Sequence, residues 1–288
     1  MRLSSLIIAA ATALSMQAGM PTDSTTTVAE KPLRPVTSAY MFEAGSAKLR
    51  DTYLTPLEYN GWDVALSYER FQAMGFDPQR WTMRLGGSMR LERVDNPAGT
   101  TSMWSVGLSP SWSMMRRWRP VANLTVAVGP EVGVDIGARY LMRNSNNPAS
   151  VQASATVGVT AMATYNLQLG RLPITLRYQP SMPLAGVFFS PDYDELYYEI
   201  WLGNHSGLCH FAWPGSLFRL DNLVTADLRF GATNLRLGYR CEVYSSKASD
   251  IVTRHITHAF VIGVTTEWLS LSAGSRRSPD AATISAFY

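Results

Sequence analysis

Hydrophobic and polar residues alternate along most of this chain. Between Val132 and Tyr140 the even positions are apolar, whereas the odd positions are glycine or charged. Side chains on a β-strand point alternately to opposite faces, so one face of this segment is apolar and the other carries ions. The alternation recurs from Trp62 onward. An apolar outside and a polar inside predict an all-β, antiparallel up-and-down transmembrane β-barrel.

The alternating segments are about 9–11 residues long, the length that a tilted membrane strand requires. The clearest ones start at Trp62, Met83, Trp104, Val132, Val151, Ile174, Val224, Leu235 and Ile256. Weaker segments are Leu124–Val128, Leu184–Phe189, Leu196–Leu202 and Thr283–Tyr288, and Tyr40–Gly45 is an optional further strand. This pattern predicts about 12 strands, with a range of about 12–14, because single-chain bacterial barrels have even strand numbers.

The connections between these segments differ in length on the two sides of the predicted barrel. Gly129-Pro130, Gly170-Arg171 and Gly231-Ala232 are interpreted as tight turns on one side. Longer polar connections lie near Arg143–Pro148, His205–Leu220 and Ser245–Asp250. Short turns are typical of the periplasmic side, so the longer connections are predicted to face outward.

The N-terminus predicts export. Arg2 precedes the apolar run Leu3–Leu14, and small residues follow, as in a secretory signal peptide. We therefore predict a signal peptide over residues 1–20, a disordered lead-in rich in Thr, Ser and Pro over 21–37, and one barrel domain over 38–288. The predicted location is the outer membrane, reached after secretion across the inner membrane. The terminal aromatic Tyr288 is typical of barrels that the assembly machinery inserts, so outer-membrane lipid and the barrel-assembly machinery are the predicted partners.

Composition narrows the function classes. Charged residues make up 16% of the chain and the net charge is +3, without a basic block, which argues against a nucleic-acid partner. Apolar residues are dispersed, and no run after the signal approaches the roughly 20 residues of a membrane-spanning helix. Lysine occurs only at three positions, so arginine carries most of the positive charge. Arginine is the better residue for enclosed ion pairs, because its planar guanidinium donates several hydrogen bonds.

A secreted ligand-binding β-sandwich is the alternative fold, because its strands alternate in the same way. The predicted polar face is rich in Gly, Ser and Thr, and Trp, Tyr and Met recur near strand ends. These features favour a barrel with aromatic girdles at the membrane interfaces.

Several stretches resemble a known family. The run Asp51–Trp62 followed by Tyr68-Glu69-Arg70 is similar to an uncharacterised family of predicted Gram-negative outer-membrane barrels, a domain of unknown function. Leu235–Arg240 and His258–Gly263 are similar to its C-terminal half. The resemblance covers most of the mature chain. It implies a fold and a location, but it assigns no catalytic residue.

Many charged residues fall on the polar positions of the alternating segments, so they are predicted to point into the lumen. The residues predicted to line a pore are Asp63, Glu69, Arg84, Arg90, Asp135, Arg139, Arg177, Asp227, Arg229, Arg236, Arg240 and Glu242, and Glu92 shares their parity. Their near balance suits an ion-pair network that fills the interior, and a selectivity lining is the functional alternative. The group Asp227, Arg229, Arg236 and Arg240 is the densest cluster and is predicted to hold the lumen shut.

Enzyme chemistry has weaker support. The adjacent His205 and Ser206 are the weak catalytic candidates for an outer-membrane lipid hydrolase of the phospholipase or lipid A deacylase type. Adjacent residues on a strand point to opposite faces, which disfavours that pairing. His255 and His258 also differ in parity, so no metal site is predicted, and no motif indicates a cofactor. We therefore expect a narrow or plugged pore or a structural barrel, with a small solute or a lipid as the conceivable ligand.

The connection Gly207–Leu220 is predicted to be a loop that contains Cys209 and several aromatic residues. Cys241 falls on the apolar parity of its strand. Two cysteines alone specify no disulfide framework, so small buried or lipid-facing side chains are the expected reading.

Overall fold

Long antiparallel strands make up most of the structure, which is a computed structural model. It describes residues 32–145, 147–192, 195–203, 205–230, 233–269 and 283–287, so the predicted signal peptide, Gly231-Ala232 and Tyr288 lie outside the described residues. The elements are β1 (Val36–Asp51), β2 (Thr55–Ala73), β3 (Trp81–Asp95), β4 (Ser102–Val121), β5 (Leu124–Leu141), β6 (Ala149–Leu169), β7 (Leu172–Phe189), α1 (Tyr197–Trp201), β8 (Cys209–Ala212), β9 (Leu217–Arg229), β10 (Thr233–Ala248) and β11 (Ile251–Trp268).

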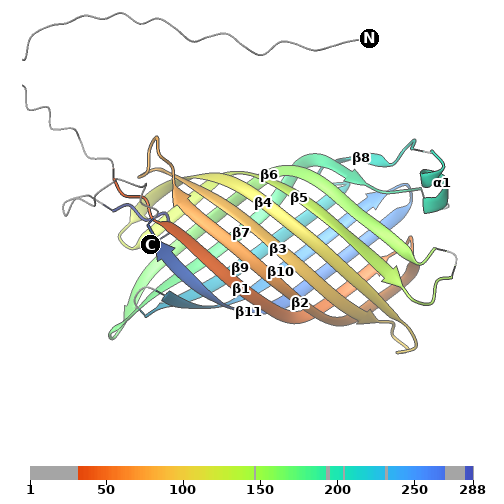
Figure 1. The fold of residues 1–288 in the computed structure, drawn as a ribbon, viewed down its shortest axis with the longest axis horizontal. Helices are drawn as coiled ribbons and strands as arrows, with labels where there is room; N and C mark the ends of the chain where they lie inside the picture. The colour runs from red at the N-terminus through yellow and green to blue at the C-terminus, as the bar shows by residue number, and fades with distance from the viewer. Residues whose placement is uncertain are drawn as a thin grey trace, which may run out of the picture. The chain divides into compact units, whose positions relative to one another are not determined.

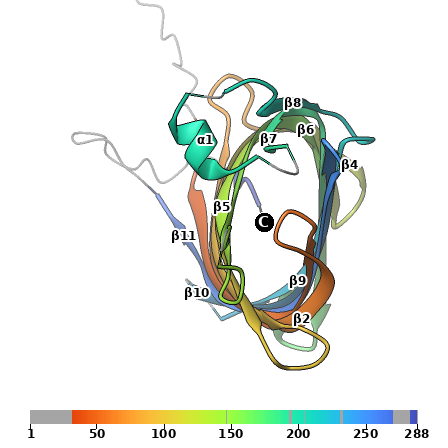
Figure 2. The same ribbon diagram turned by 90° about the vertical axis from the view of Figure 1, so that its right-hand side faces the viewer.

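The sheet closes on itself. Strands β1 to β7 pair in chain order, β9 pairs with β7 and β10, and β11 pairs with both β10 and β1. Within the described ranges, ten strands therefore form a closed barrel, and β8 pairs with the last residues of β7 beyond this ring. The strands cross the barrel at a tilt (Figure 1), and the end-on view shows the ring with α1 and β8 at its rim (Figure 2). A β-sandwich has two separate sheets, so that alternative is wrong.

The alternation of faces is confirmed. On β5, Val134 and Ile136 are 38% and 56% exposed, whereas Arg139 is 2% exposed. On β2, Leu66 is 62% exposed, whereas Asp63, which has the opposite parity, is fully buried. The apolar side chains therefore cover the outside of the barrel, and the ions point into it.

Aromatic residues gather near both ends of the outer surface. Towards one end, Trp62 and Trp104 make an edge-to-face ring contact at 5.9 Å, and Tyr140 lies opposite Trp104 in the sheet. Towards the other end, Trp118 and Trp268 are 44% and 48% exposed. Among the described helices, none combines the length and the apolar character of a membrane span.

The two ends of the barrel differ. The end at which β1 starts and β11 finishes has two-residue turns after β4 and β6, and we call it the terminal end. The opposite end, the loop end, has the connection 190–216 with α1 and β8 (Figure 1). The predicted outward connections near 143–148 and 205–220 both lie at the loop end. The one near 245–250 is shorter than predicted, because β10 continues to Ala248 and only Ser249 and Asp250, both with positive φ, form the turn.

The count of 12 strands is not confirmed, and one reason is that Gly129-Pro130 is not a turn. Both residues lie inside β5, where Pro130 is opposite Val159 of β6. A Cβ at position 129 would lie 2.0 Å from the carbonyl oxygen of Met114, so glycine permits the close approach of β4. The predicted strands Leu124–Val128 and Val132–Tyr140 are therefore one strand.

A second pair of predicted strands also merges. Ile174–Tyr178 and Leu184–Phe189 both belong to β7, whose register with β6 shifts between Val157 and Gly158. Pro183 and Ala185 are the partners on either side of this shift, so Leu184 is an extra residue in a β-bulge. The bulge reverses the parity of β7, because Leu176 faces outward before it and Phe188 faces inward after it. The change of parity explains why the pattern predicts two strands.

Two other predicted strands are absent from the described part of the ring. Leu196–Leu202 contains α1 instead of a strand, and the Glu199 carboxylate accepts a hydrogen bond from the amide of Leu196 at 3.1 Å. This contact satisfies an amide that a strand would have paired with a neighbour. Thr283 makes one isolated parallel bridge with Leu33, and the residues after it turn into the lumen. Tyr40–Gly45, the optional strand, lies in β1.

Candidate functional site: the barrel lumen

Charged side chains from most of the strands fill the barrel interior. The twelve residues predicted to line a pore all occupy the inward parity of their strands. Asp63, Asp227 and Arg236 are completely buried. These side chains therefore point into the barrel, and whether they line a pore stays a prediction.

Glu69 is the centre of a first ion-pair network. It accepts hydrogen bonds from Arg84 Nε at 3.1 Å, Arg177 Nη2 at 2.8 Å and Arg236 Nη1 at 3.0 Å. Arg236 also holds the two Asp227 oxygens at 2.7 Å each. Such forked contacts of arginine with a carboxylate are strong and directional.

Arg84 extends this network to Glu131 of β5, at 3.0 Å. We call the set Glu69, Arg84, Glu131, Arg177, Asp227 and Arg236 the Glu69 network. Its three carboxylates balance its three guanidiniums, and it joins opposite walls of the barrel, since β2 and β3 lie across the ring from β7. A balanced, hydrogen-bonded arrangement is the form in which buried charges are tolerated.

A second network lies nearer the loop end. Arg240 holds the two oxygens of Asp221 at 2.8 and 2.6 Å and donates to Glu43 at 2.8 Å. Arg219 pairs with Glu242 at 2.9 Å and also contacts Asp135.

Arg90 connects the carboxylates of this second network. Its guanidinium lies 3.5 Å from both Asp63 and Glu242, 3.9 Å from Glu43 and 4.0 Å from Glu92. The Nε2 of His255 lies 2.7 Å from Glu92. We call these residues, together with those bonded to Arg240 and Arg219, the loop-end network.

The predicted cluster of Asp227, Arg229, Arg236 and Arg240 is divided between the two networks. Arg236 lies directly opposite Asp227 in the β9–β10 ladder, as the hairpin prediction requires. Arg240 instead lies opposite Leu223 and bonds to Asp221 and Glu43. Four residues along a strand correspond to about 13 Å, which is too far for one compact group. Arg229 occupies an inward position opposite Asn234.

The C-terminal residues occupy the lumen at the terminal end. The Phe287 ring is 5% exposed and packs against Phe71 at 5.1 Å between ring centroids. The guanidinium carbons of Arg177 and Arg236 lie 5.4 and 5.2 Å from its ring centroid, which are cation–π distances. We call residues Ile284–Phe287 the C-terminal plug. Seen end-on, the segment 283–287 lies inside the outline of the ring (Figure 2).

Polar contacts also fix the plug. Arg117 Nη1 donates to the Ser285 carbonyl oxygen at 2.8 Å, and the Ser285 hydroxyl donates to Glu267 at 2.6 Å. The plug packs on inward apolar residues near this end, namely Phe71, Ala73, Met115, Ala127 and Met162. These side chains form an apolar seat beside the charged part of the lumen, so the plug and its seat are complementary.

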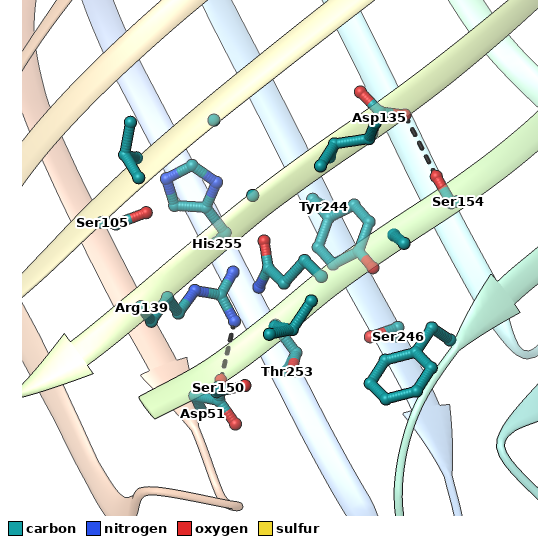
Figure 3. A pocket seen from close by; sticks show the side chains of 18 of the residues that line it. Asp51, Ser105, Asp135, Arg139, Ser150, Ser154, Tyr244, Ser246, Thr253 and His255 are labelled. Atoms are coloured by element: carbon teal, nitrogen blue, oxygen red, sulfur yellow. Dashed lines mark hydrogen bonds and ion pairs between the residues drawn. The ribbon is translucent and has the colours of Figure 1, made fainter. Parts of the chain in front are cut away.

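Cavities remain between these contacts, and two of them lie beside the ion-pair networks. One, of about 60 Å³, lies next to the Glu69 network. The larger, of about 110 Å³, lies near the loop end and is lined by Asp135, Arg139 and His255 among others (Figure 3). Arg139 pairs there with Asp51 at 2.9 Å. Within the described ranges, no group of His, Cys, Asp and Glu has the arrangement of a metal site.

The sequence prediction missed several lumen residues. Arg219 and Asp221 both lie in β9. Arg219 falls within the predicted loop Gly207–Leu220, and Asp221 falls between that loop and the strand predicted to start at Val224. Glu131 follows the presumed turn, and Glu43 lies in the optional strand. His255 points into the lumen, whereas His258 bonds to the outward Tyr239, so their opposite parity is confirmed. Period-two alternation extended through these segments would have found the four charged residues.

The weak catalytic candidates are not brought into the lumen. His205 and Ser206 are both exposed in the connection between α1 and β8 and line neither cavity. Cys209 begins β8 rather than lying in a loop, and both Cys209 and Cys241 are free thiols.

A tyrosine ties the loop-end connection to the barrel. The Tyr53 hydroxyl donates to the Glu195 carbonyl oxygen at 2.9 Å and accepts a hydrogen bond from Asn147 at 2.6 Å. Its ring contacts Tyr197 of α1 edge-on at 5.6 Å. Burial raises the pKa of Tyr53 to about 12, and burial also raises the pKa of Tyr197.

The fold and lumen define a closed antiparallel β-barrel with a polar, ion-paired interior. Residues 5–275 match a family described as a protein of unknown function, DUF3316, and the chain belongs to that family. The resemblance to an uncharacterised barrel family is thus confirmed. No curated protein matches this sequence.

Solved structures with a similar fold are outer-membrane barrels of different activities. The outer-membrane protease OmpT from Escherichia coli is 7% identical with a TM-score of 0.49, over 85% of this chain and 100% of its own. The translocator domain of the autotransporter NalP from Neisseria meningitidis is 13% identical with a TM-score of 0.40, over 84% and 90%. The COG4313 outer-membrane channel from Pseudomonas putida F1 is 11% identical with a TM-score of 0.34, over 86% and 100%. Similarity at this level concerns the fold and transfers no activity.

Proposed function

We propose that this chain is an outer-membrane β-barrel protein whose lumen is plugged, so that it is a closed barrel and not an open channel in the state described. The observation that carries the proposal is the burial of Phe287 in the lumen beneath two guanidiniums. A ring held between charged side chains and an apolar seat fills space that an open pore would leave to water.

The outer surface supports the membrane location. Outward side chains such as Leu66 and Ile136 are large, apolar and more than half exposed, which is costly for a protein in water. Aromatic residues lie towards both ends of this surface, as in the girdles of membrane barrels. The strands are 13–21 residues long in the ring, so they extend beyond the about 25 Å apolar band of a membrane barrel.

The ion-pair networks support the closed state. Charges of both signs alternate in space and bond to one another across the lumen, and the two cavities described above are small. A selectivity lining would need a continuous water path past its charges. We propose that the predicted pore-lining residues hold the barrel walls together.

The test is the accessibility of a cysteine beneath the plug. Ala127 belongs to the apolar seat and is completely buried. In a background with Cys209→Ser and Cys241→Ser, we expect Ala127→Cys to be unreactive towards a small charged thiol reagent in the full chain. Deletion of residues 283–288 should make this cysteine reactive. Phe287→Ala is the alternative variant if the truncated chain does not assemble, and it should partially increase the labelling of the cysteine.

The matched control is Ala65→Cys, which is 3% exposed and lies on β2 away from the plug. It should stay unreactive in all backgrounds. Rapid labelling of Ala127→Cys in the full chain, or a steady conductance of that chain in planar bilayers, would refute the plugged lumen.

A further inference from the structure

The larger cavity, near the loop end, is unusual for the number of hydroxyl groups on its wall. Its lining includes seven serines and one threonine, which are Ser88, Ser105, Ser109, Ser150, Ser154, Ser190, Ser246 and Thr253. The lining also includes the amide of Gln152, the rings of Tyr53, Phe189 and Tyr244, and several apolar residues. Figure 3 shows that the labelled side chains come from strands on several sides of the barrel. Hydroxyls both donate and accept hydrogen bonds, so this wall suits a partner that does the same.

The ions on the same wall are already paired with one another. Arg139 pairs with Asp51, Arg219 with Asp135 and Glu242, and His255 with Glu92. Four carboxylates thus face three guanidiniums and one imidazole in this lining. Such a wall produces no strong field of one sign, so it favours a neutral ligand over an ion.

Two of the charged lining residues each contain a buried, unpaired polar atom. The Nε of Arg139 and the Oε2 of Glu92 have no hydrogen-bond partner among the described residues, although these side chains are 2% and 1% exposed. One is a donor and the other an acceptor. Because these two atoms are themselves closed to a molecule the size of water, the hydrogen bonds to a molecule in the cavity would come from the hydroxyls and the Gln152 amide.

We propose that this cavity binds a small neutral polyhydroxylated molecule, such as a triose-sized polyol or the end of a sugar. The cavity volume of about 110 Å³ is comparable to the ~150 Å³ cavity known to hold a benzene-sized ligand, and it therefore fits about six heavy atoms. The aromatic side chains offer contact to the C–H groups of such a molecule, and the hydroxyls and the Gln152 amide offer the hydrogen bonds. The polyol would bind near the loop end, on the far side of the Glu69 network from the plug.

The test uses the full chain in a detergent without a sugar headgroup, with glycerol and glucose as probes. Saturation-transfer NMR should show saturable binding of at least one of the two polyols in the millimolar range. Glycine and inorganic phosphate, as a zwitterion and an anion, should show none. The double variant Ser105→Val with Gln152→Leu removes two lining groups without touching an ion pair, and it should bind at least tenfold more weakly.

Gln168→Leu is the control, because Gln168 lies on the same strand as Gln152 but outside the cavity. It should bind as the unmodified chain does, and heat-modifiability on a gel would show that each variant is folded. Three results would each overturn the proposal. They are no saturable polyol binding up to about 100 mM, a preference for glycine or phosphate, and equal binding by the double variant. Binding in detergent is independent of labelling beneath the plug, so this test and that of the closed lumen can fail separately.

Discussion

Replacing Glu69 by glutamine would test the physical role of the lumen charges. The Glu69 carboxylate accepts hydrogen bonds from three guanidiniums at 2.8–3.1 Å and is 2% exposed. One such pair is worth about 5 kcal/mol of Coulomb energy at an effective dielectric constant of about 20, before desolvation and the repulsion among the arginines are subtracted. Glu69→Gln keeps the shape but leaves Arg84, Arg177 and Arg236 with two carboxylates in place of three. Breaking a buried ion pair by removing one partner typically costs about 3–5 kcal/mol, and we expect that loss here.

A loss of this size should be visible in the temperature at which the folded band disappears on a detergent gel. With about 2–4 °C per kcal/mol for a domain of this size, the midpoint should fall by roughly 6–20 °C. Glu58→Gln is the control, because Glu58 lies on the same strand and is exposed, and its midpoint should not move. A midpoint for Glu69→Gln within about 2 °C of the unmodified chain would mean that water solvates these arginines, and the closed, ion-paired lumen would be refuted.

Three other outcomes are expected. Val134→Arg should impair membrane assembly far more than Gly133→Ser, because a charge facing lipid near the midplane costs about 2–4 kcal/mol, and equal assembly of the two would overturn the assigned faces. The raised pKa of Tyr53 means that the fold stabilises the protonated phenol. Its contribution to the stability of the fold is therefore complete below its ordinary pKa of 10 and is lost as the pH rises to about 12. Protease cleavage of the loop-end connection should increase over that interval. Tyr53→Phe should weaken this pH dependence, and the remainder should come from Tyr197, whose pKa burial also raises. In a Cys241→Ser background, the exposed Cys209 should react with an impermeant maleimide on intact cells, because the loop end is predicted to face outward. Labelling only after cell lysis would show that the loop end faces the cell interior.

The face of almost every strand could be predicted from the sequence. The position of Asp63, Asp135 and Arg236 inside and of Val134 and Leu66 outside follows from a period of two, because the alternation of side chains is a local property of a strand. The lengths of the strands did not follow so directly. Gly129-Pro130 has the composition of a turn, and only the neighbouring strand β4 explains the glycine inside a continuous strand.

The partners of the charges depended on register, which brings together residues far apart in the chain. Arg236 and Asp227 could be paired from sequence, because a hairpin places them opposite each other. Glu69, Arg84 and Arg177 could not, because they come from β2, β3 and β7 and meet only when the barrel closes. Thr283–Tyr288 was predicted to be the closing strand, but Thr283 makes only an isolated bridge and Phe287 lies inside the barrel. The sequence by itself determined which side chains face the lumen, whereas the closure of the sheet decided what fills it, because closure alone fixes the diameter and the neighbours of each inward residue.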